Sequence, residues 1–330
     1  MKRILGFILF LLLFSASNNF LSAEQKPAKI AISVWIGWMP FWVMQSEGFI
    51  AKRCKEQGVP TVEFAVMDYT ASLSAYQAGA VDGVVATIMD SIRPVANGID
   101  TTVVLINDFS NGGDGVLFKD GLKVEDTKTS KINIQLEQFS VSHYLFLRYL
   151  DSLGGKYKES DFNIQNISAD NAGKAFLTDE SVKAVVTWNP HLFQALENQK
   201  GKLMFSSKDI PGEIIDLLIF NTKFVNKNQK SVQAVVNAWY DVMKMLKDPA
   251  RRKDALNKMA SEAGATVKEF ERMLEDVVLF DSPKKAAKFL ESEKIKATEK
   301  KVMNFLIKQA QIDEEGQLTF DSSYIKNFKR

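Results

Sequence analysis

Short apolar runs alternate with helix-like segments along the first two thirds of the chain. The first four runs are rich in β-branched residues, which is typical of buried strands. They are KIAISVWI at 29–36, TVEFAVM at 61–67, AVDGVVATI at 80–88 and TTVVLINDF at 101–109. This alternation of strand and helix predicts an α/β fold with a parallel sheet and helices on both faces.

The segment FSNGGDG at 109–115 interrupts this pattern with three glycines in seven residues. A plain loop would fit, but strand-like runs then return at 130–136, 161–168, 183–190 and 213–221. We therefore interpret 109–115 as a crossover or hinge between two similar α/β halves, 29–112 and 116–220. After them, apolar residues at a spacing of three to four between 232 and 246 predict a helical C-terminal region.

The N-terminus has the pattern of a secretory signal peptide. Lys2 and Arg3 precede an apolar run from Ile4 to Phe14, and LSA at 21–23 comes just before a charged residue. A membrane anchor is the alternative, but the run is shorter than the ~20 residues that span a bilayer. We expect cleavage after residue 23 and export to the periplasm, without a lipid anchor because no cysteine lies close behind the apolar run.

Charge and cysteine content narrow the class of protein. The chain has 42 Lys and Arg against 40 Asp and Glu, and the first 23 residues hold two of the basic ones. This balance argues against nucleic acid or an anionic membrane as a partner. Cys54 is the only cysteine, so an internal disulfide is excluded, and two histidines with one cysteine do not suggest a metal site.

Three tryptophans fall within eight positions of the stretch ISVWIGWMPFW at 32–42, where a strand ends and a helix begins. Pro40 suits the first turn of that helix. A core can use one such tryptophan, whereas three in one turn suggest the wall of a site for a flat molecule.

Several of these motifs resemble one family. The segments MPFWVMQSEGFIAK, LSAYQAGAVDGVVAT and VKAVVTWNP look like substrate-binding proteins of ABC importers, in the branch that binds nitrate, sulfonates, taurine and thiamine precursors. More narrowly, WIGWMPFW, NDFSNGGDG and VVTWNP resemble the branch of urea- or amine-type uptake proteins.

The resemblance implies a type II periplasmic-binding fold, in which two α/β lobes enclose a ligand. Lobe 1 would comprise 24–112 and 221–330, and lobe 2 would comprise 113–220, with residues 1–23 as the signal peptide. It also implies a monomer without a cofactor that closes around a small molecule and then docks to a membrane permease.

In α/β folds, ligands bind beyond the carboxyl ends of the strands. The polar and aromatic residues that the sequence places there are our candidate ligand contacts: Trp35, Trp38, Met39, Asp68, Tyr69, Thr87, Asp90, Asp108, Asp114, Glu137, Ser140, Trp188 and Asn189. Carboxylates are frequent in this set, and it contains no lysine or arginine, the nearest being Arg93.

A cation explains both features, because aromatic faces attract it and carboxylates supply directed hydrogen bonds. Guanidinium also matches a carboxylate bidentately, and flat, neutral urea could use the same groups. Other roles stay open: Trp35 could face the core, Asp68 and Asp90 could cap helices, and Asp108 and Asp114 could satisfy hinge backbone.

Three alternatives remain. A thiamine-pyrimidine precursor would need a larger pocket with aromatics on both faces. Nitrate or a sulfonate would require the carboxylates to point away from the ligand. An enzyme similar to the pyrimidine-precursor synthase that shares this fold would need a cysteine-rich motif and an active histidine. Cys54 lies far from the expected cleft, so we expect no catalytic residues.

Overall fold

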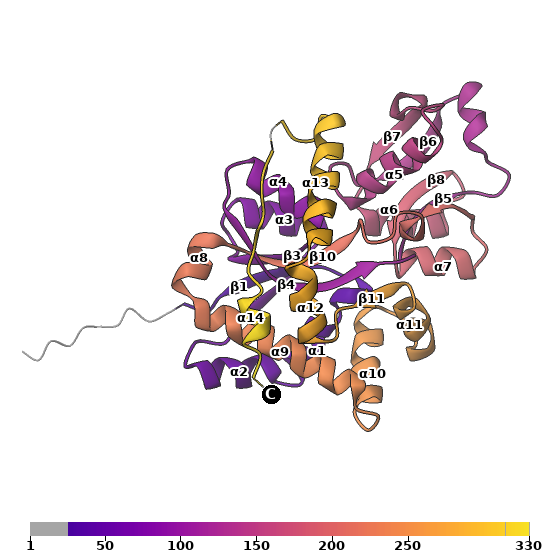
Figure 1. Ribbon diagram of the computed structural model, residues 1–330. Coiled ribbons are helices and arrows are strands. Elements are labelled where there is room, and N and C mark those ends of the chain that lie inside the picture. The colour runs from indigo at the N-terminus through magenta and orange to yellow at the C-terminus, as the bar shows by residue number, and fades with distance from the viewer. Residues whose placement is uncertain (1–25, 314, 330) are drawn as a thin grey trace, which may run out of the picture.

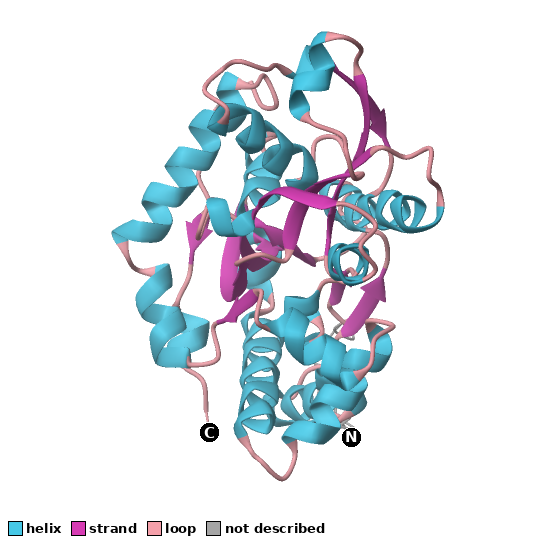
Figure 2. Cartoon of the chain, turned by 90° about the vertical axis from the view of Figure 1, so that its right-hand side faces the viewer, coloured by secondary structure: helices cyan, strands magenta, loops and turns pink. Residues whose placement is uncertain are grey.

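The computed structural model describes residues 26–313 and 315–329, and the predicted signal peptide 1–23 lies outside this range. Two separate β-sheets organise the chain, and helices pack around each of them (Figures 1 and 2). The α/β class expected from the sequence is therefore confirmed. Within the described residues, no helix is both long and apolar enough to cross a bilayer.

The first sheet has seven strands. Their order is β11-β4-β10-β3-β1-β2, and β12 pairs with β4 from outside this path. The strands are β1 (Lys29–Ile32), β2 (Glu63–Val66), β3 (Gly83–Thr87), β4 (Thr101–Ser110), β10 (Ile215–Asn221), β11 (Val277–Leu279) and β12 (Thr319–Phe320).

Helices from both ends of the chain pack around this sheet. They are α1 (Pro40–Ser46), α2 (Phe49–Gln57), α3 (Tyr69–Gln77), α4 (Ile88–Ala96), α8 (Thr222–Lys227), α9 (Gln229–Lys247), α10 (Arg252–Glu262), α11 (Val267–Leu274), α12 (Pro283–Leu290), α13 (Glu293–Lys308) and α14 (Ser323–Lys326). The C-terminal region is thus mostly helical, as its apolar spacing predicts.

The second sheet has five strands in the order β7-β6-β8-β5-β9. They are β5 (Asp114–Phe118), β6 (Ile132–Leu136), β7 (Phe162–Asn166), β8 (Ala184–Trp188) and β9 (Lys202–Ser206). This sheet packs with α5 (Val141–Ser152), α6 (Ala169–Thr178) and α7 (His191–Glu197), at the upper right of Figure 1. The sequence pattern did not predict β5 and β9.

Two expectations about the sheets were wrong. We expected parallel sheets, but β10 runs antiparallel to β3 and β4, and β5 runs antiparallel to β8 and β9. We also placed the run 213–221 in the second half, whereas β10 lies between β3 and β4 of the first sheet. Both β5 and β10 enter their sheet by a crossover from the other sheet, which explains their reversed direction.

The two crossovers lie side by side. The chain leaves β4 and enters β5 through 111–113, within the segment 109–115 expected to be a crossover, and it returns to β10 after the short helix η4 (Ser207–Asp209). The hydroxyls of Ser110 and Ser207 lie 2.7 Å apart, and the N–H of Gly112 donates to the Ser207 hydroxyl at 2.6 Å. These hydrogen bonds link the two crossovers to each other.

Helix α9 anchors the N-terminal helices to the core of the first sheet. Trp239 of α9 is fully buried, and its ring centroid lies 5.0 Å from that of Phe41 in α1. Arg53 of α2 donates two hydrogen bonds to Asp241, at 2.6 and 2.8 Å.

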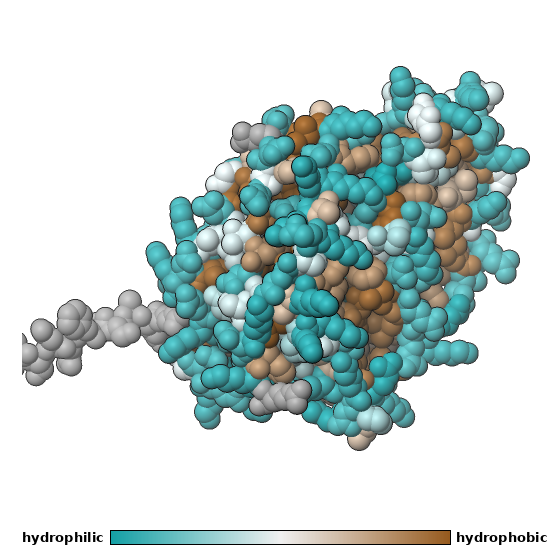
Figure 3. Space-filling model, viewed as in Figure 1, coloured by the Kyte–Doolittle hydropathy of each residue, from teal (hydrophilic) through white to brown (hydrophobic). Residues whose placement is uncertain are grey.

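On the face shown in Figure 3, hydrophilic side chains cover most of the surface.

Replacing Trp239 with alanine tests this packing. We expect Trp239→Ala to lower the free energy of unfolding by about 3–5 kcal/mol, because it leaves a cavity between α9 and α1. Lys230→Ala, at an exposed position of the same helix, should change it by less than about 0.5 kcal/mol. Chemical denaturation of both variants measures the difference, and equal losses would contradict the assignment of Trp239 to the core.

Candidate functional site

A small cavity lies between the two sheets, close to the crossovers. Its lining residues are Val34, Trp35, Trp38, Tyr69, Thr87, Asp114, Val141, Trp188, Ile214 and Asp216. Its volume is about 20 Å³. A cavity of this size suits a ligand of a few non-hydrogen atoms.

Two of the tryptophans reach the cavity through one tight turn. Strand β1 ends at Ile32, and Trp35 has an extended backbone conformation. A short 3₁₀ turn, η1 (Ile36–Trp38), follows, in which the N–H of Trp38 donates to the carbonyl of Trp35 at 2.9 Å. Pro40 then opens α1 at its first position. This turn places both indoles on the same cavity.

The aromatic rings form a cage to which both halves of the chain contribute. The centroids of Trp38 and Tyr69 lie 5.6 Å apart, and Tyr69 meets Trp188 of β8 edge-on at 5.8 Å. The indole nitrogens of Trp38 and Trp188 have no hydrogen-bond partner among the described residues. The cage therefore offers aromatic faces and two spare N–H donors.

Three buried carboxyls gather at the base of this cage. Asp114 and Asp216 line the cavity, and Asp108 lies behind them, where its Oδ1 accepts a hydrogen bond from the Trp35 indole at 3.2 Å. Asp216 sits opposite Asp108 on one neighbouring strand and opposite Thr87 on the other. Among the described lining residues, none is lysine, arginine or histidine.

Burial without a basic partner perturbs all three carboxyls. It raises the pKa of Asp108 to about 6 and that of Asp114 to about 7. Burial raises the pKa of Asp216 well above its usual value, and the charges of Asp108 and Asp114 raise it further. Asp108 lies opposite Asp216 on the adjacent strand, so its charge disfavours ionisation of Asp216.

Asp90 supports the cage from behind instead of lining it. Its Oδ2 accepts hydrogen bonds from the hydroxyls of Tyr69, at 2.8 Å, and Thr87, at 2.9 Å. Its Oδ1 accepts from the guanidinium of Arg93 at 3.2 Å. Asp90 is therefore charge-paired, unlike Asp114 and Asp216, and the helix cap is supplied by Thr87.

Glu137 and Ser140 lie outside the cavity lining, in the second half of the chain. Glu137 accepts a hydrogen bond from the Thr70 hydroxyl of α3 at 2.7 Å, and burial raises its pKa to about 7. Ser140 caps α5 by accepting from the N–H of Ser142. The contact between Thr70 and Glu137 joins the two halves beside the cage.

Three other predicted ligand contacts, Met39, Asp68 and Asn189, do not line the cavity. Met39 is fully buried next to the turn without lining the cavity. Asp68 is exposed at the start of α3, and its side chain makes no capping hydrogen bond. Asn189 accepts from the N–H of Phe193 at 2.9 Å and thereby secures the start of α7.

Sequence reasoning missed Asp216. An acidic residue inside the apolar run EIIDLLIFN is unusual, because a buried carboxylate is costly without a partner. That observation could have identified it. We read the run as part of the second half, however, and so did not place it beside Asp108.

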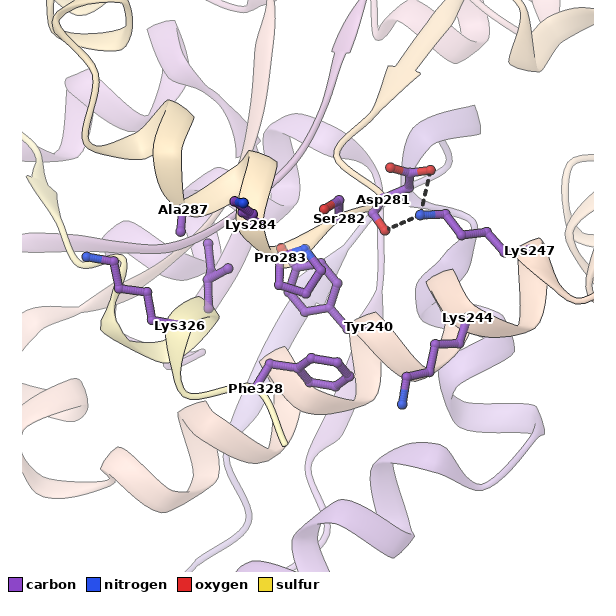
Figure 4. Close-up of a pocket in the computed structure, with 11 residues that line it drawn as sticks. Tyr240, Lys244, Lys247, Asp281, Ser282, Pro283, Lys284, Ala287, Lys326 and Phe328 are labelled. Carbon is purple, nitrogen blue, oxygen red and sulfur yellow. Dashed lines mark hydrogen bonds and ion pairs between the residues drawn. The ribbon is translucent and has the colours of Figure 1, made fainter. Parts of the chain in front are cut away.

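A larger groove of about 610 Å³ opens on the surface elsewhere (Figure 4). It is lined by Tyr240, Lys244, Lys247, Asp281, Ser282, Pro283, Lys284, Ala287, Ile325, Lys326 and Phe328. Its one acidic side chain, Asp281, is already paired with Lys247 at 2.9 Å. All of its residues follow β10 in the chain, so this groove does not lie between the halves.

In the described residues, no cluster of histidine, cysteine or carboxylate side chains could hold a metal ion.

Comparison with known proteins identifies the fold. The NMT1-like family matches residues 22–260. No curated protein matches the chain. The alkanesulfonate-binding protein SsuA from Xanthomonas axonopodis pv. citri, solved bound to MOPS, is 15% identical with a TM-score of 0.73, and the similarity covers 91% of this chain and all of that one.

Two further solved structures are similar. One is a ligand-binding component of an ABC-type import system from Staphylococcus aureus, with 16% identity, a TM-score of 0.67 and coverage of 93% of this chain and 100% of that chain. The other is the periplasmic nitrate-binding protein NrtA from Synechocystis PCC 6803, with 14% identity, a TM-score of 0.61 and coverage of 76% and 70%. These similarities confirm the type II periplasmic-binding fold.

Replacing Gly113 in the first crossover tests whether the Trp35 ring packs against this segment. A methyl group there would lie 2.5 Å from the Trp35 ring, so we expect Gly113→Ala to displace the indole and cost about 1–3 kcal/mol of stability. Near-ultraviolet circular dichroism should change. Gly98→Ala, where φ is +78° and no atom lies within 4 Å, should lose stability without altering that spectrum. An unchanged spectrum in Gly113→Ala would refute the packing of Trp35 against the crossover.

Proposed function

The chain belongs to the NMT1-like family, and we propose that it is the exported substrate-binding component of an ABC importer. Its ligand would be a small nitrogenous solute: guanidinium, a small amine or urea. The type II periplasmic-binding fold supports the general role, as does the similarity to a ligand-binding component of an ABC-type import system. The signal-peptide pattern at residues 1–23 supports a periplasmic location.

The cavity between the sheets supports binding by closure of two lobes. A ligand shifts an open–closed equilibrium only if it contacts both lobes. Trp35, Trp38 and Tyr69 come from the first half of the chain, and Asp114 and Trp188 come from the second sheet. The sequence-based lobes are 24–112 with 221–330, and 113–220. We move β10 (Ile215–Asn221) from the second lobe to the first, because it pairs with β3 and β4.

The observation that carries the choice of ligand is the charge of the cage. Two carboxyls line a cavity that has aromatic walls and no basic side chain among its described lining residues. Each aromatic face attracts a cation by roughly 0.5–2 kcal/mol, and carboxylates add directed hydrogen bonds. Nitrate or a sulfonate would meet carboxylates at the cavity wall, so the anions of the similar proteins are poor candidates. The small cavity also disfavours a substituted pyrimidine.

Urea is the second candidate, for a specific reason. The unpartnered indole N–H groups of Trp38 and Trp188 could donate to its carbonyl oxygen, while Asp114 and Asp216 accept from its amides. Guanidinium lacks such an acceptor, so the two ligands make different use of the cage.

Calorimetric titration tests the proposal. The panel comprises guanidinium, urea, methylamine, an aminopyrimidine, nitrate and taurine, added to protein freed of bound ligand by mild unfolding and refolding. We expect saturable binding at roughly micromolar or lower Kd for guanidinium, an amine or urea. Binding of nitrate or taurine alone would contradict the charge argument.

A pair of tryptophan variants assigns the binding to the cage. Trp188→Leu should weaken binding roughly 2- to 30-fold, the equivalent of one cation–π contact. Trp42→Leu is the matched control, because Trp42 is half-buried on α1 and does not line the cavity. Equal affinities in the two variants would place the ligand elsewhere.

A further inference from the structure

The base of the cage has a charge problem that a ligand must resolve. Asp108, Asp114 and Asp216 are each at most 5% exposed, and they influence one another electrostatically. Three carboxylates in so dry a place would repel each other strongly if all were ionised. The ligand-free site therefore holds protons.

The first proton belongs to the pair formed by Asp108 and Asp216. These residues are opposite each other on adjacent strands, and two buried carboxyls so placed are costly to ionise together, so the pair retains one proton. The Trp35 indole donates to the same pair. With one proton between them, the two carboxyls carry a single negative charge. The indole N–H of Trp35 stabilises that charge.

Asp114 is held differently. It begins β5 at the first crossover, opposite Trp188 of β8, and it lines the cavity directly. The hydroxyls of Ser110 and Ser207 are its neighbours at the crossover, and its backbone N–H donates to the Ser207 hydroxyl at 3.5 Å. Neither group carries a charge, so Asp114 has no cation to stabilise its ionised form.

The charged side chains on neighbouring elements are engaged elsewhere. His143 of α5 contacts Glu159, His191 of α7 contacts Asp170, and Lys208 of η4 contacts Asp276. Arg93 is paired with Asp90 behind Tyr69. Asp108 and Asp216 are thus the acidic neighbours of Asp114; burial, and then the charge of Asp108, disfavour its ionisation.

We propose that the site exchanges a proton for its ligand: a guanidinium- or ammonium-type monocation binds as Asp114 gives up its proton. The balance is simple, because one positive charge enters the cavity and one proton leaves for the solvent. The total charge of the site is unchanged, and Asp114 becomes the carboxylate that pairs with the cation. This inference rests on the proposed function and narrows its ligand from nitrogenous solutes to cations.

The exchange fixes the direction of the pH dependence. Burial raises the pKa of Asp114 to about 7 in the ligand-free protein, and a bound cation lowers it. Affinity for the cation should therefore fall as pH drops below about 7, by up to about tenfold per pH unit. Above that range affinity should level off. Binding of neutral urea would release no proton and would not depend on pH in this way.

Calorimetry in buffers of different ionisation enthalpy counts the protons released. We titrate guanidinium into the purified protein at pH 6 and at pH 9, with urea as the neutral probe. Close to one proton per guanidinium at pH 6 and almost none at pH 9 would support the exchange. Guanidinium binding without proton release at pH 6 would overturn it and leave the proposed function standing.

Two variants assign the proton. Asp114→Asn should bind guanidinium more weakly, release no proton and lose the pH dependence. Asp276→Asn is the matched control, because Asp276 lies at the same hinge but is paired with Lys208 at 3.0 Å. It should behave as the wild type does. Full proton release from Asp114→Asn would overturn the assignment to Asp114, even if the variant bound weakly.

Two further outcomes separate this inference from the function on which it rests. Binding of urea but not guanidinium would refute the exchange while agreeing with the proposed function. Failure of every nitrogenous probe, with nitrate or taurine binding instead, would refute both. Near-ultraviolet circular dichroism of each variant verifies that the cage is folded before any of these results is interpreted.

Discussion

Burying carboxyl groups without a basic partner is the costly step around which the site is built. The cost of moving an isolated carboxylate out of water is several kcal/mol even after relaxation. Here three such groups meet at the base of one cavity, and the available arginine, Arg93, is committed to Asp90. Apolar residues at these positions would stabilise the core better. The arrangement is therefore explained by a cationic ligand that supplies the missing positive charge.

The fold brings these carboxyls together through its crossovers. Asp108 lies near the end of β4, Asp114 begins β5 and Asp216 is the second residue of β10. Each is within a few residues of the point where the chain passes between the sheets, and Ser207 ties the two passages together through its hydroxyl. A change in the angle between the sheets would therefore alter the distance from Asp114, in the second sheet, to Asp108 and Asp216, which are paired in the first.

The sequence predicted part of this arrangement well. Alternating apolar runs predict most strands because each buried strand needs a continuous apolar stretch, and the Trp35–Trp38 turn stands out because three large aromatics are close together. The position of β10 could not be predicted in this way. Periodicity shows that a run is a strand but does not show which sheet it joins, so Asp216 stayed hidden. Likewise, Asp68 and Asp90 both precede or begin helices, and the sequence could not show that one is exposed and the other paired with Arg93.

The most direct test of the site is a crystal structure of the protein grown with guanidinium. We expect the cation inside the cage of Trp35, Trp38, Tyr69 and Trp188, with its nitrogens within hydrogen-bond distance of Asp114 and Asp216. An anion or water alone in the cage, with guanidinium bound only on the surface, would contradict the view that the buried carboxyls exist to receive a cation.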